Sequence, residues 1–198
     1  MTAPRRVPPH EVRIIGGQWK RSKLPVADAP GLRPTPDRVR ETLFNWLGHD
    51  LSGWRCLDAF AGSGALGFEA ASRGAAEVVL VERDARLARS LRESQARLGA
   101  AGLRVEIADG VANMRRASPH SYELIFLDPP FGANLHQPAL AAAAPLVVRG
   151  GFIYLEADQA ADDAALAPLG LRVHRHGRAG AVHFHLLTPA DAAEGSPG

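Results

Sequence analysis

The stretch Cys56-Leu57-Asp58-Ala59-Phe60-Ala61-Gly62-Ser63-Gly64-Ala65-Leu66-Gly67 decides the fold of this chain. An apolar strand ends on a carboxylate, a glycine-rich turn follows, and a helix begins after the turn. Gly62 and Gly64 let the backbone turn tightly and bring a ligand close to main-chain N–H groups. The N-terminus of the helix adds unpaired donors and a partial positive charge. The stretch therefore predicts a site for a nucleotide-type cofactor.

A carboxylate follows the glycines at the spacing expected of such a site. Glu82 ends the next apolar run, Val78 to Val81, and lies 20 residues past Gly62, where an acid can meet ribose hydroxyls. The spacing Gly62-x-Gly64-x-x-Gly67 also fits the dinucleotide fingerprint, which many plain turns share. An NAD-dependent oxidoreductase therefore stays open as an alternative on the glycines alone.

The motif Asp128-Pro129-Pro130-Phe131 favours a different chemistry. An amino nitrogen on a nucleobase or amide is a poor nucleophile because its lone pair is delocalised. The Asp128 carboxylate and the Pro129 carbonyl can each accept one amino hydrogen, which favours a pyramidal nitrogen, and Phe131 offers a face for stacking. Asp-Pro is also common in plain turns. At the end of a buried strand beside the glycine loop, however, the motif predicts transfer of a methyl group to an amino nitrogen.

Composition indicates one ordinary globular domain. The chain has 198 residues, of which 46% are hydrophobic and 22% are charged. No apolar run approaches the ~20 residues of a membrane helix, and no secretory signal is recognisable at the start. The single cysteine, Cys56, is expected to be buried and reduced. We therefore expect a cytoplasmic protein without a membrane partner.

Positive charge is concentrated at the start of the chain. The first 40 residues hold nine Lys and Arg against three Asp and Glu, a net of +6, so that the remaining 158 carry −4. A basic extension on a slightly acidic body is typical of a protein that binds a polyanion. A solvated arm without a partner is the alternative that charge alone leaves open.

The order of predicted elements indicates an α/β fold, a Rossmann-like, mostly parallel seven-stranded sheet with helices on both faces. Strands are expected at 55–59, 77–82, 103–108, 122–128 and 151–157, and helices at 65–73, 84–99, 110–117 and 136–147. The segments 171–176 and 181–187, joined by 177–180, predict an antiparallel hairpin at the sheet edge.

A small basic hairpin is expected before this domain. It spans residues 13–24 and turns at Gly16-Gly17. Thr35 is expected to cap a helix that begins at Pro36. The domain boundaries predicted from these patterns are a disordered tail (1–12), a basic hairpin and extension (13–33), a catalytic domain (34–187) and a second disordered tail (188–198).

Four histidines form two His-x-His pairs in the C-terminal hairpin, His174/His176 and His183/His185. Alternation places Phe184 and its apolar neighbours on the opposite face, so these histidines fit the polar face of an edge strand pair. With no cysteine nearby, we expect no metal site.

The chain resembles the class I S-adenosylmethionine-dependent methyltransferases. More narrowly, it resembles the bacterial 16S ribosomal RNA guanine-N2 methyltransferases of the RsmD type, over roughly residues 12–187. The resemblance rests on four blocks, namely Arg13-Ile14-Ile15-Gly16-Gly17, Leu32 to Leu47, Asp58 to Gly67, and Asp128 to Phe131. The segment Lys20-Arg21-Ser22-Lys23 departs from the Arg-Gly-Arg often present in that family.

The resemblance implies transfer of a methyl group from S-adenosylmethionine to the N2 amine of a guanine in small-subunit RNA, leaving S-adenosylhomocysteine. It implies a monomer whose partner is 16S ribosomal RNA, the small subunit or an assembly intermediate. The residues implied to bind the cofactor are Asp58, Ala59, Phe60, Gly62, Ser63, Gly64, Glu82, Arg83, Asp109 and Gly110. Those implied to bind and activate the guanine are Asp128, Pro129, Pro130 and Phe131. Those expected to hold RNA are Arg13, Lys20, Arg21, Lys23, Arg33, Arg38 and Arg40.

Two further alternatives remain at this point. Methyltransferases that act on protein glutamine or on another nucleobase resemble this chain, but they typically carry Asn-Pro-Pro-Tyr where this chain has Asp128 to Phe131. A non-catalytic RNA-binding assembly factor is the other, and the intact motifs argue against it.

Overall fold

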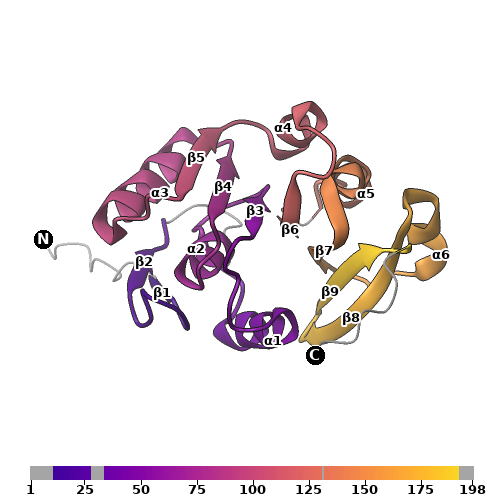
Figure 1. The fold of residues 1–198 in the computed structure, drawn as a ribbon, viewed down its shortest axis with the longest axis horizontal. Helices are drawn as coiled ribbons and strands as arrows, with labels where there is room; N and C mark the ends of the chain where they lie inside the picture. Colours follow the sequence, from indigo (N-terminus) through magenta and orange to yellow (C-terminus); the bar gives the residue numbers. More distant parts are fainter. Residues whose placement is uncertain (1–10, 28–33, 131, 192–198) are drawn as a thin grey trace, which may run out of the picture.

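Seven strands form one sheet in the computed structural model, which describes residues 11–27, 34–130 and 132–191 (Figure 1). The strand order is β5-β4-β3-β6-β7-β9-β8. Five strands run parallel, namely β3 (Arg55–Asp58), β4 (Glu77–Glu82), β5 (Leu103–Ile107), β6 (Tyr122–Leu127) and β7 (Val147–Ala157). β9 (Val182–Pro189) lies antiparallel between β7 and β8 (Leu171–Ala179). The predicted mostly parallel sheet with an antiparallel edge hairpin is confirmed.

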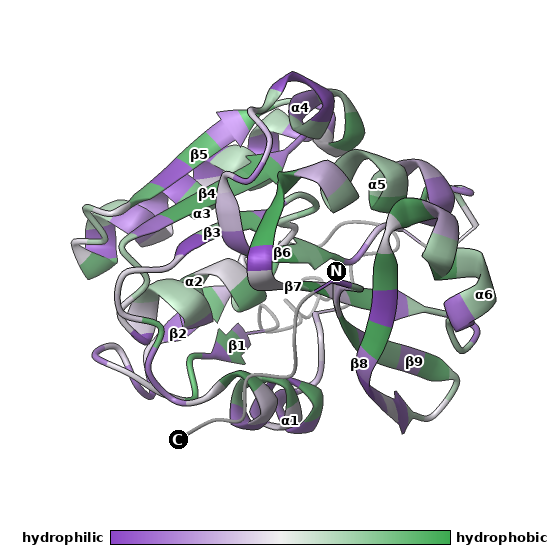
Figure 2. Ribbon diagram, turned by 45° about the vertical axis from the view of Figure 1, so that its right-hand side comes forward, coloured by the Kyte–Doolittle hydropathy of each residue, from purple (hydrophilic) through white to green (hydrophobic). Residues whose placement is uncertain are grey.

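Helices cover both faces because the central strands are apolar on both sides. Successive residues of a strand alternate between two cores: Leu80 and Phe126 belong to one, Val81 and Leu127 to the other. The first core holds residues of α1 (Asp37–Leu47), α2 (Ala65–Ser72) and α3 (Ala85–Leu98). The second holds residues of α4 (Gly110–Arg116), α5 (His136–Ala143) and α6 (Asp163–Leu166). Figure 2 shows β6 as mostly hydrophobic, whereas the edge strand β5 carries hydrophilic residues.

The strand order reverses at the centre of the sheet, and this reversal positions the site. β3 pairs with β4 on one side and with β6 on the other, with Asp58 opposite both Leu80 and Phe126. Chain segments that leave β3 and β6 therefore diverge to opposite faces. A crevice opens at their carboxyl ends, where open α/β sheets bind ligands.

The N-terminal hairpin exists, but its predicted span and turn are wrong. β1 (Glu11–Arg13) pairs with β2 (Lys23–Pro25), so residues 11 and 12 are part of a strand and not of a tail. Gly17 does not make a two-residue turn; the segment around it packs on α2, where Gln18 N–H donates to the Ser72 carbonyl at 2.8 Å. Residues 11–25, called the arm below, are thus held against α2. A two-stranded hairpin this short is not stable by itself and needs such a contact. The remainder of the expected tails, residues 1–10 and 192–198, lies outside the described residues.

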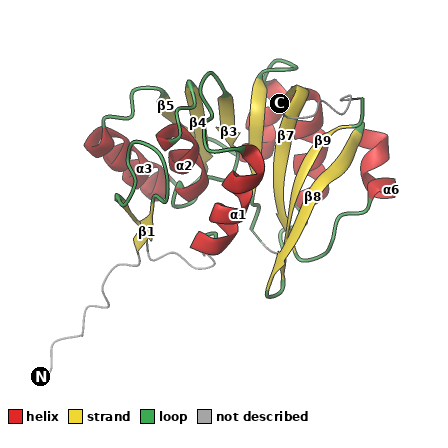
Figure 3. Cartoon of the chain, turned by 60° about the horizontal axis from the view of Figure 1, so that its bottom comes forward, coloured by secondary structure: helices red, strands yellow, loops and turns green. Residues whose placement is uncertain are grey.

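The edge hairpin is longer and turns more tightly than its sequence predicts. Gly177 and Ala179 continue β8, and the turn is Gly180-Ala181, with Gly180 at φ 61°. β9 extends to Pro189, two residues past the predicted end. Figure 3 shows α1 beside this hairpin, and Trp46 of α1 stacks on Phe184 with ring centroids 5.3 Å apart.

The prediction that Thr35 caps α1 is also wrong. Pro36 occupies the cap position, and the Thr35 hydroxyl donates to Glu156 at 2.6 Å instead. Asp84, by contrast, caps α3 by accepting from Arg86 N–H at 2.8 Å.

Among the described helices, none combines the length and the apolar character that crossing a bilayer requires.

Candidate active site

A cavity of about 360 Å³ lies at the carboxyl ends of the central strands. Its volume is within the range of small-molecule sites. Twelve predicted site residues line it, namely Asp58, Ala59, Phe60, Gly62, Ser63, Glu82, Arg83, Asp109, Gly110, Asp128, Pro129 and Pro130. The two halves of the prediction, the glycine loop and the double proline, therefore share one cavity.

The glycine loop approaches the cavity through backbone that only glycine accommodates well. Gly62 and Gly64 have φ values of 53° and 79°. Gly64 lies outside the cavity wall, where a Cβ would come within 2.6 Å of the Leu91 side chain. Gly64 shapes the turn into α2 and packs against α3, and its expected cofactor contact stays a prediction. At Gly110 a Cβ would come within 2.1 Å of the Ala59 carbonyl oxygen, so this glycine lets two cavity loops touch.

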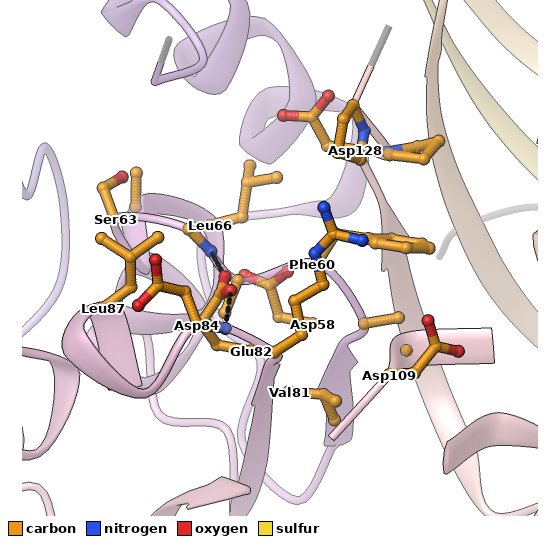
Figure 4. A pocket seen from close by; sticks show the side chains of 18 of the residues that line it. Asp58, Phe60, Ser63, Leu66, Val81, Glu82, Asp84, Leu87, Asp109 and Asp128 are labelled. Atoms are coloured by element: carbon orange, nitrogen blue, oxygen red, sulfur yellow. Dashed lines mark hydrogen bonds between the residues drawn. The ribbon is translucent and has the colours of Figure 1, made fainter. Parts of the chain in front are cut away.

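Glu82 connects the glycine loop to the loop after β4. Its carboxylate accepts from Gly62 N–H at 2.9 Å and from Asp84 N–H at 2.8 Å (Figure 4). Each oxygen retains a further lone pair, and the side chain is partly exposed. Glu82 can therefore order both loops and still accept hydrogen bonds from a diol.

Asp58 is a buried carboxyl at the end of β3. Its Oδ2 accepts from Gly67 N–H at 3.2 Å, and within the described part of the chain its Oδ1 is buried without a hydrogen-bond partner. The pKa of Asp58 is raised to about 7, chiefly by burial and also by the charges of Glu82 and Glu156, against the lowering effect of the Gly67 and Phe60 backbone N–H groups. An unpaired buried acceptor is costly. Because Asp58 lies in the cavity wall, its Oδ1 suits a cationic group or a hydrogen-bond donor of a ligand.

Asp128 follows β6 and lies further along the cavity than Asp58 and Glu82 (Figure 4). Burial raises its pKa well above the usual range, and the negative charges of Glu156 and Asp58 add to the rise. Pro129 is buried and Pro130 is exposed, and both line the cavity. Phe131 lies outside the described residues, so its expected stacking role stays a prediction.

Asp109 and Arg83 lie at the rim of the cavity and are both exposed. Asp109 also caps α4, accepting from Ala112 N–H at 2.8 Å. Its carboxylate thus serves a local structural purpose beside the cavity.

Sequence reasoning missed several residues of the cavity. The additional lining residues are Pro34, Thr35, Ala61, Ala65, Leu66, Val81, Asp84, Arg86, Leu87, Ala108 and Leu135. Sequence reasoning also missed Glu156, which binds Thr35 from the end of β7. Glu156 follows the apolar run Phe152 to Leu155, just as Glu82 and Asp128 follow theirs. The rule that acids at strand carboxyl ends meet at one edge could have identified it.

The predicted RNA-binding cations fall into two groups. Arg13, Lys20, Arg21, Lys23 and Arg38 are exposed. Arg40 needs correction: its side chain is fully buried and pairs with Glu69 at 3.4 Å and Asp37 at 2.6 Å. A guanidinium without exposed surface does not reach a phosphate. Arg33 lies outside the described residues.

The histidines of the edge hairpin differ from the expected polar face. A register shift in β8 brings His176, His183 and His185 together, with one ring nitrogen of each within 4.8 Å of the others. His185 is fully buried, and its Nε2 accepts from Ala161 N–H at 2.9 Å. Burial lowers its pKa to about 4. The rings of His176 and His185 stack within 8° of parallel. A metal binds in the plane of an imidazole, so these two rings share no point where both could bind one ion.

Comparison with known proteins gives consistent matches over almost the whole described chain. Residues 12–188 match the family described as Conserved hypothetical protein 95. The chain is 41% identical over 179 residues to Ribosomal RNA small subunit methyltransferase D of Escherichia coli (strain K12), covering 89% of each protein. It is 44% identical over 135 residues to the protein of that name from Haemophilus influenzae, covering 66% of this chain and 69% of that one. Among solved structures, a putative methyltransferase, yhhF, from Escherichia coli superposes with a TM-score of 0.79 at 35% identity, covering 91% of this chain and 98% of that one.

Proposed function

Because the chain belongs to the Conserved hypothetical protein 95 family, which it shares with the ribosomal RNA small subunit methyltransferase D proteins, we propose a specific reaction for it. The protein transfers the methyl group of S-adenosylmethionine to the N2 amine of a guanine in 16S ribosomal RNA. We expect it to act as a monomer in the cytoplasm, on the small subunit or its assembly intermediate.

One observation carries this proposal: Asp128 and Pro129 line the same cavity as Asp58, Glu82 and the Gly62 loop. Asp128 and Pro129 have the acceptors that an amino nucleophile needs. Asp58, Glu82 and the Gly62 loop have the groups that a nucleoside cofactor with an amino-acid tail needs. Joining them in one cavity of about 360 Å³ supports methyl transfer between the two ligands.

The donor groups of the cavity fit S-adenosylmethionine. Glu82 retains lone pairs for the ribose hydroxyls. The buried Oδ1 of Asp58, which has no partner among residues 11–27, 34–130 and 132–191, suits a positively charged group. The N–H groups at the start of α2 face the same region, because the helix begins directly after the loop at Ala65. When bound, the cofactor supplies an electrophilic methyl group on a sulfonium sulfur.

Asp128 and Pro129 supply the other half of the chemistry. In its ionised form, the Asp128 carboxylate accepts one hydrogen of the guanine amine, and the Pro129 carbonyl accepts the second. These bonds favour the pyramidal nitrogen that exists in the transition state rather than the planar amine. The nitrogen becomes a strong acid once it is alkylated, so Asp128 or water is a sufficient base for its proton.

The exposed cations of the arm provide the contact with RNA. Arg13, Lys20 and Arg21 belong to the segment held on α2, and Arg38 lies in the first turn of α1, shortly after the cavity residue Thr35. Such cations bind phosphates without reading sequence, which positions the substrate over the cavity. The target base must leave its stack to enter the cavity, and unpaired bases do so at least cost.

The proposal is tested by counting labelled methyl groups transferred from S-adenosylmethionine. The acceptors are naked 16S ribosomal RNA, small subunits that lack this methyl group, and a protein extract. We expect incorporation into RNA or subunits that elutes as N2-methylguanosine after digestion to nucleosides. Label in protein, or binding of NAD without methyl transfer, would overturn the proposal.

A further inference from the structure

Glu156 is a buried carboxylate next to the proposed methyl-transfer site. It lies near the end of β7, which pairs with β6 directly before Asp128. Only 5% of its surface is exposed. Its Oε1 accepts from the Thr35 hydroxyl at 2.6 Å and from the Tyr154 hydroxyl at 2.8 Å. Burying a carboxylate is expensive unless it serves the fold or the site.

Thr35 connects Glu156 to the cavity. Thr35 lines the cavity, and its side chain is buried and held by Glu156. Its backbone carbonyl accepts from Arg40 Nε at 3.3 Å. Thr35 is therefore fixed through both its side chain and its main chain.

Arg40 extends this connection to the basic arm. The buried Arg40 guanidinium pairs with Glu69, and the Glu69 carboxylate accepts from Ile15 and Gly16 N–H, each at 2.8 Å. A continuous set of buried polar contacts thus leads from the arm, through Glu69, Arg40 and Thr35, to Glu156. The wall of the cavity and the RNA-binding arm rest on the same contacts.

Glu156 also influences Asp128 through its charge. Leu127 of β6 pairs with Leu155 of β7, so Asp128 and Glu156 occupy the next positions on two adjacent parallel strands. The other titratable groups whose charge or hydroxyl acts there are Asp58 from β3 and Tyr154 from β7, and Tyr154 donates to Glu156. Burial is the first cause of the raised pKa of Asp128, and Glu156 is the first of the charges that add to it. The pKa of Glu156 is itself raised by burial, against the opposing effect of its bonds to Thr35 and Tyr154. The two carboxyls therefore compete for ionisation.

We infer that Glu156 is a positioning residue for the proposed methyl transfer: it holds Thr35 in the cavity wall and places a second carboxyl beside Asp128. The inference rests on the proposed function, because it assigns Asp128 the part of amine acceptor. The two effects of Glu156 separate chemically. An amide at this position keeps an acceptor for Thr35 and Tyr154 but has no charge, whereas a valine at position 35 removes the hydroxyl and keeps an ionisable carboxyl at position 156.

The first experiment follows the single-turnover rate of methyl transfer against pH in the full chain. The rate of the wild type falls as pH falls through the pKa of Asp128, because the protonated carboxyl is a poorer acceptor. For Glu156→Gln we expect this acid limb to move to lower pH by about one unit or more, the scale of a removed like charge. For Thr35→Val we expect a smaller displacement of the limb than in Glu156→Gln, because the lost hydroxyl bond favours the neutral form of a carboxyl that is still present, together with a severalfold higher KM for RNA. Glu93→Gln, the same substitution on the exposed face of α3, is the matched control and should reproduce the wild-type profile.

A second measurement does not depend on activity. Carbon-13 NMR of labelled Asp side chains follows the titration of Asp128 directly, with Asp128→Asn identifying its signal. We expect a lower midpoint in Glu156→Gln than in the wild type and in Glu93→Gln. Unmoved midpoints would overturn the inference, even where the wild type produces N2-methylguanosine. A lowered midpoint in a protein that forms no N2-methylguanosine would leave the Glu156–Asp128 relationship standing and overturn the proposed function instead.

Discussion

The Glu82 carboxylate accepts a hydrogen bond from the backbone N–H of Gly62 at 2.9 Å, across 20 residues of chain. Its second oxygen accepts from Asp84 N–H at 2.8 Å. One acid at the end of β4 therefore fixes the glycine loop after β3 and the start of α3. Glu82 therefore links the ordering of these two loops to the binding of a nucleoside.

Replacing Glu82 tests this link. Glu82→Ala should weaken S-adenosylmethionine binding by about 1–3 kcal/mol, the usual cost of removing charge-assisted hydrogen bonds. It should also lower the melting temperature of the free protein, because Gly62 N–H then has no carboxylate acceptor. Calorimetric titration and thermal unfolding measure the two effects. Unchanged cofactor affinity would remove Glu82 from the binding site.

The raised pKa of Asp58 predicts a pH dependence of cofactor binding. The pKa of about 7 in the free protein means that Asp58 is largely protonated below pH 7. A cationic ligand prefers the ionised form, so binding must then release a proton. We expect affinity to fall ever more steeply below pH 7, approaching about tenfold per pH unit by pH 5.5, measured by calorimetry. Asp58→Asn should bind weakly with a flat profile, and a wild-type profile equally flat over this range would contradict the assignment.

The same pKa affects stability with a definite sign. A carboxyl whose pKa is raised by folding binds a proton more tightly in the folded state. The contribution of Asp58 is therefore fully present below its unfolded pKa of 3.8 and disappears as pH rises towards 7. In Asp58→Asn this part of the pH dependence of unfolding by urea should be absent. An unchanged dependence in the variant would show that Asp58 ionises in the folded state as freely as in the unfolded state.

Charge reversal on the arm tests the RNA contact. Changing Arg13, Lys20 and Arg21 to Glu should lower RNA affinity for any sequence and should flatten its salt dependence, by about 0.7–0.9 in logarithmic slope for each phosphate that is no longer neutralised. Anisotropy titrations over a range of salt concentrations measure both, and cofactor affinity should not change. Reversal of Arg115 and Arg116 at the end of α4 is the matched control. An arm variant with the wild-type salt slope would disprove the contact.

Glu69 should matter for stability rather than chemistry. It accepts from Ile15 N–H, Gly16 N–H and Arg73, and it pairs with the buried Arg40. Glu69→Ala leaves the Arg40 guanidinium buried without this carboxylate, which typically costs about 3–5 kcal/mol. Glu93→Ala on the surface should change the unfolding free energy by less than about 0.5 kcal/mol. Equal urea midpoints for the two variants would contradict this assignment.

Much of the fold follows from local pattern. The apolar runs ending at Asp58, Glu82 and Asp128 predict parallel strands, and the acids at their ends predict one shared edge. The structure brings all three into a single cavity. The strands are correct to within a few residues because burial on both faces leaves an unmistakable apolar run.

The errors arise where distant contacts override local preference. Thr35 has the sequence context of a helix cap, but Glu156, 121 residues away, takes its hydroxyl. Arg40 has the context of a surface cation, but Glu69, 29 residues away, pairs with it in the core. No local pattern reports such partners, because they meet only when the sheet and helices pack. The predicted turn of the N-terminal hairpin at Gly16-Gly17 fails for the same reason, since contacts with α2 hold the segment around Gly17.

The most direct test of the account is the single-turnover rate of Asp128→Ala on small-subunit RNA, with the product identified by mass spectrometry of nucleosides. The pyramidal nitrogen exists only in the transition state, so the rate of the variant should fall by about 10²–10³ while cofactor and RNA affinities change little. Asp128→Asn keeps an acceptor oxygen and should retain more activity. The account predicts N2-methylguanosine as the product in every active form. A fully active Asp128→Ala, or a methyl group on adenine, on a ring nitrogen of guanine or on protein, would contradict it.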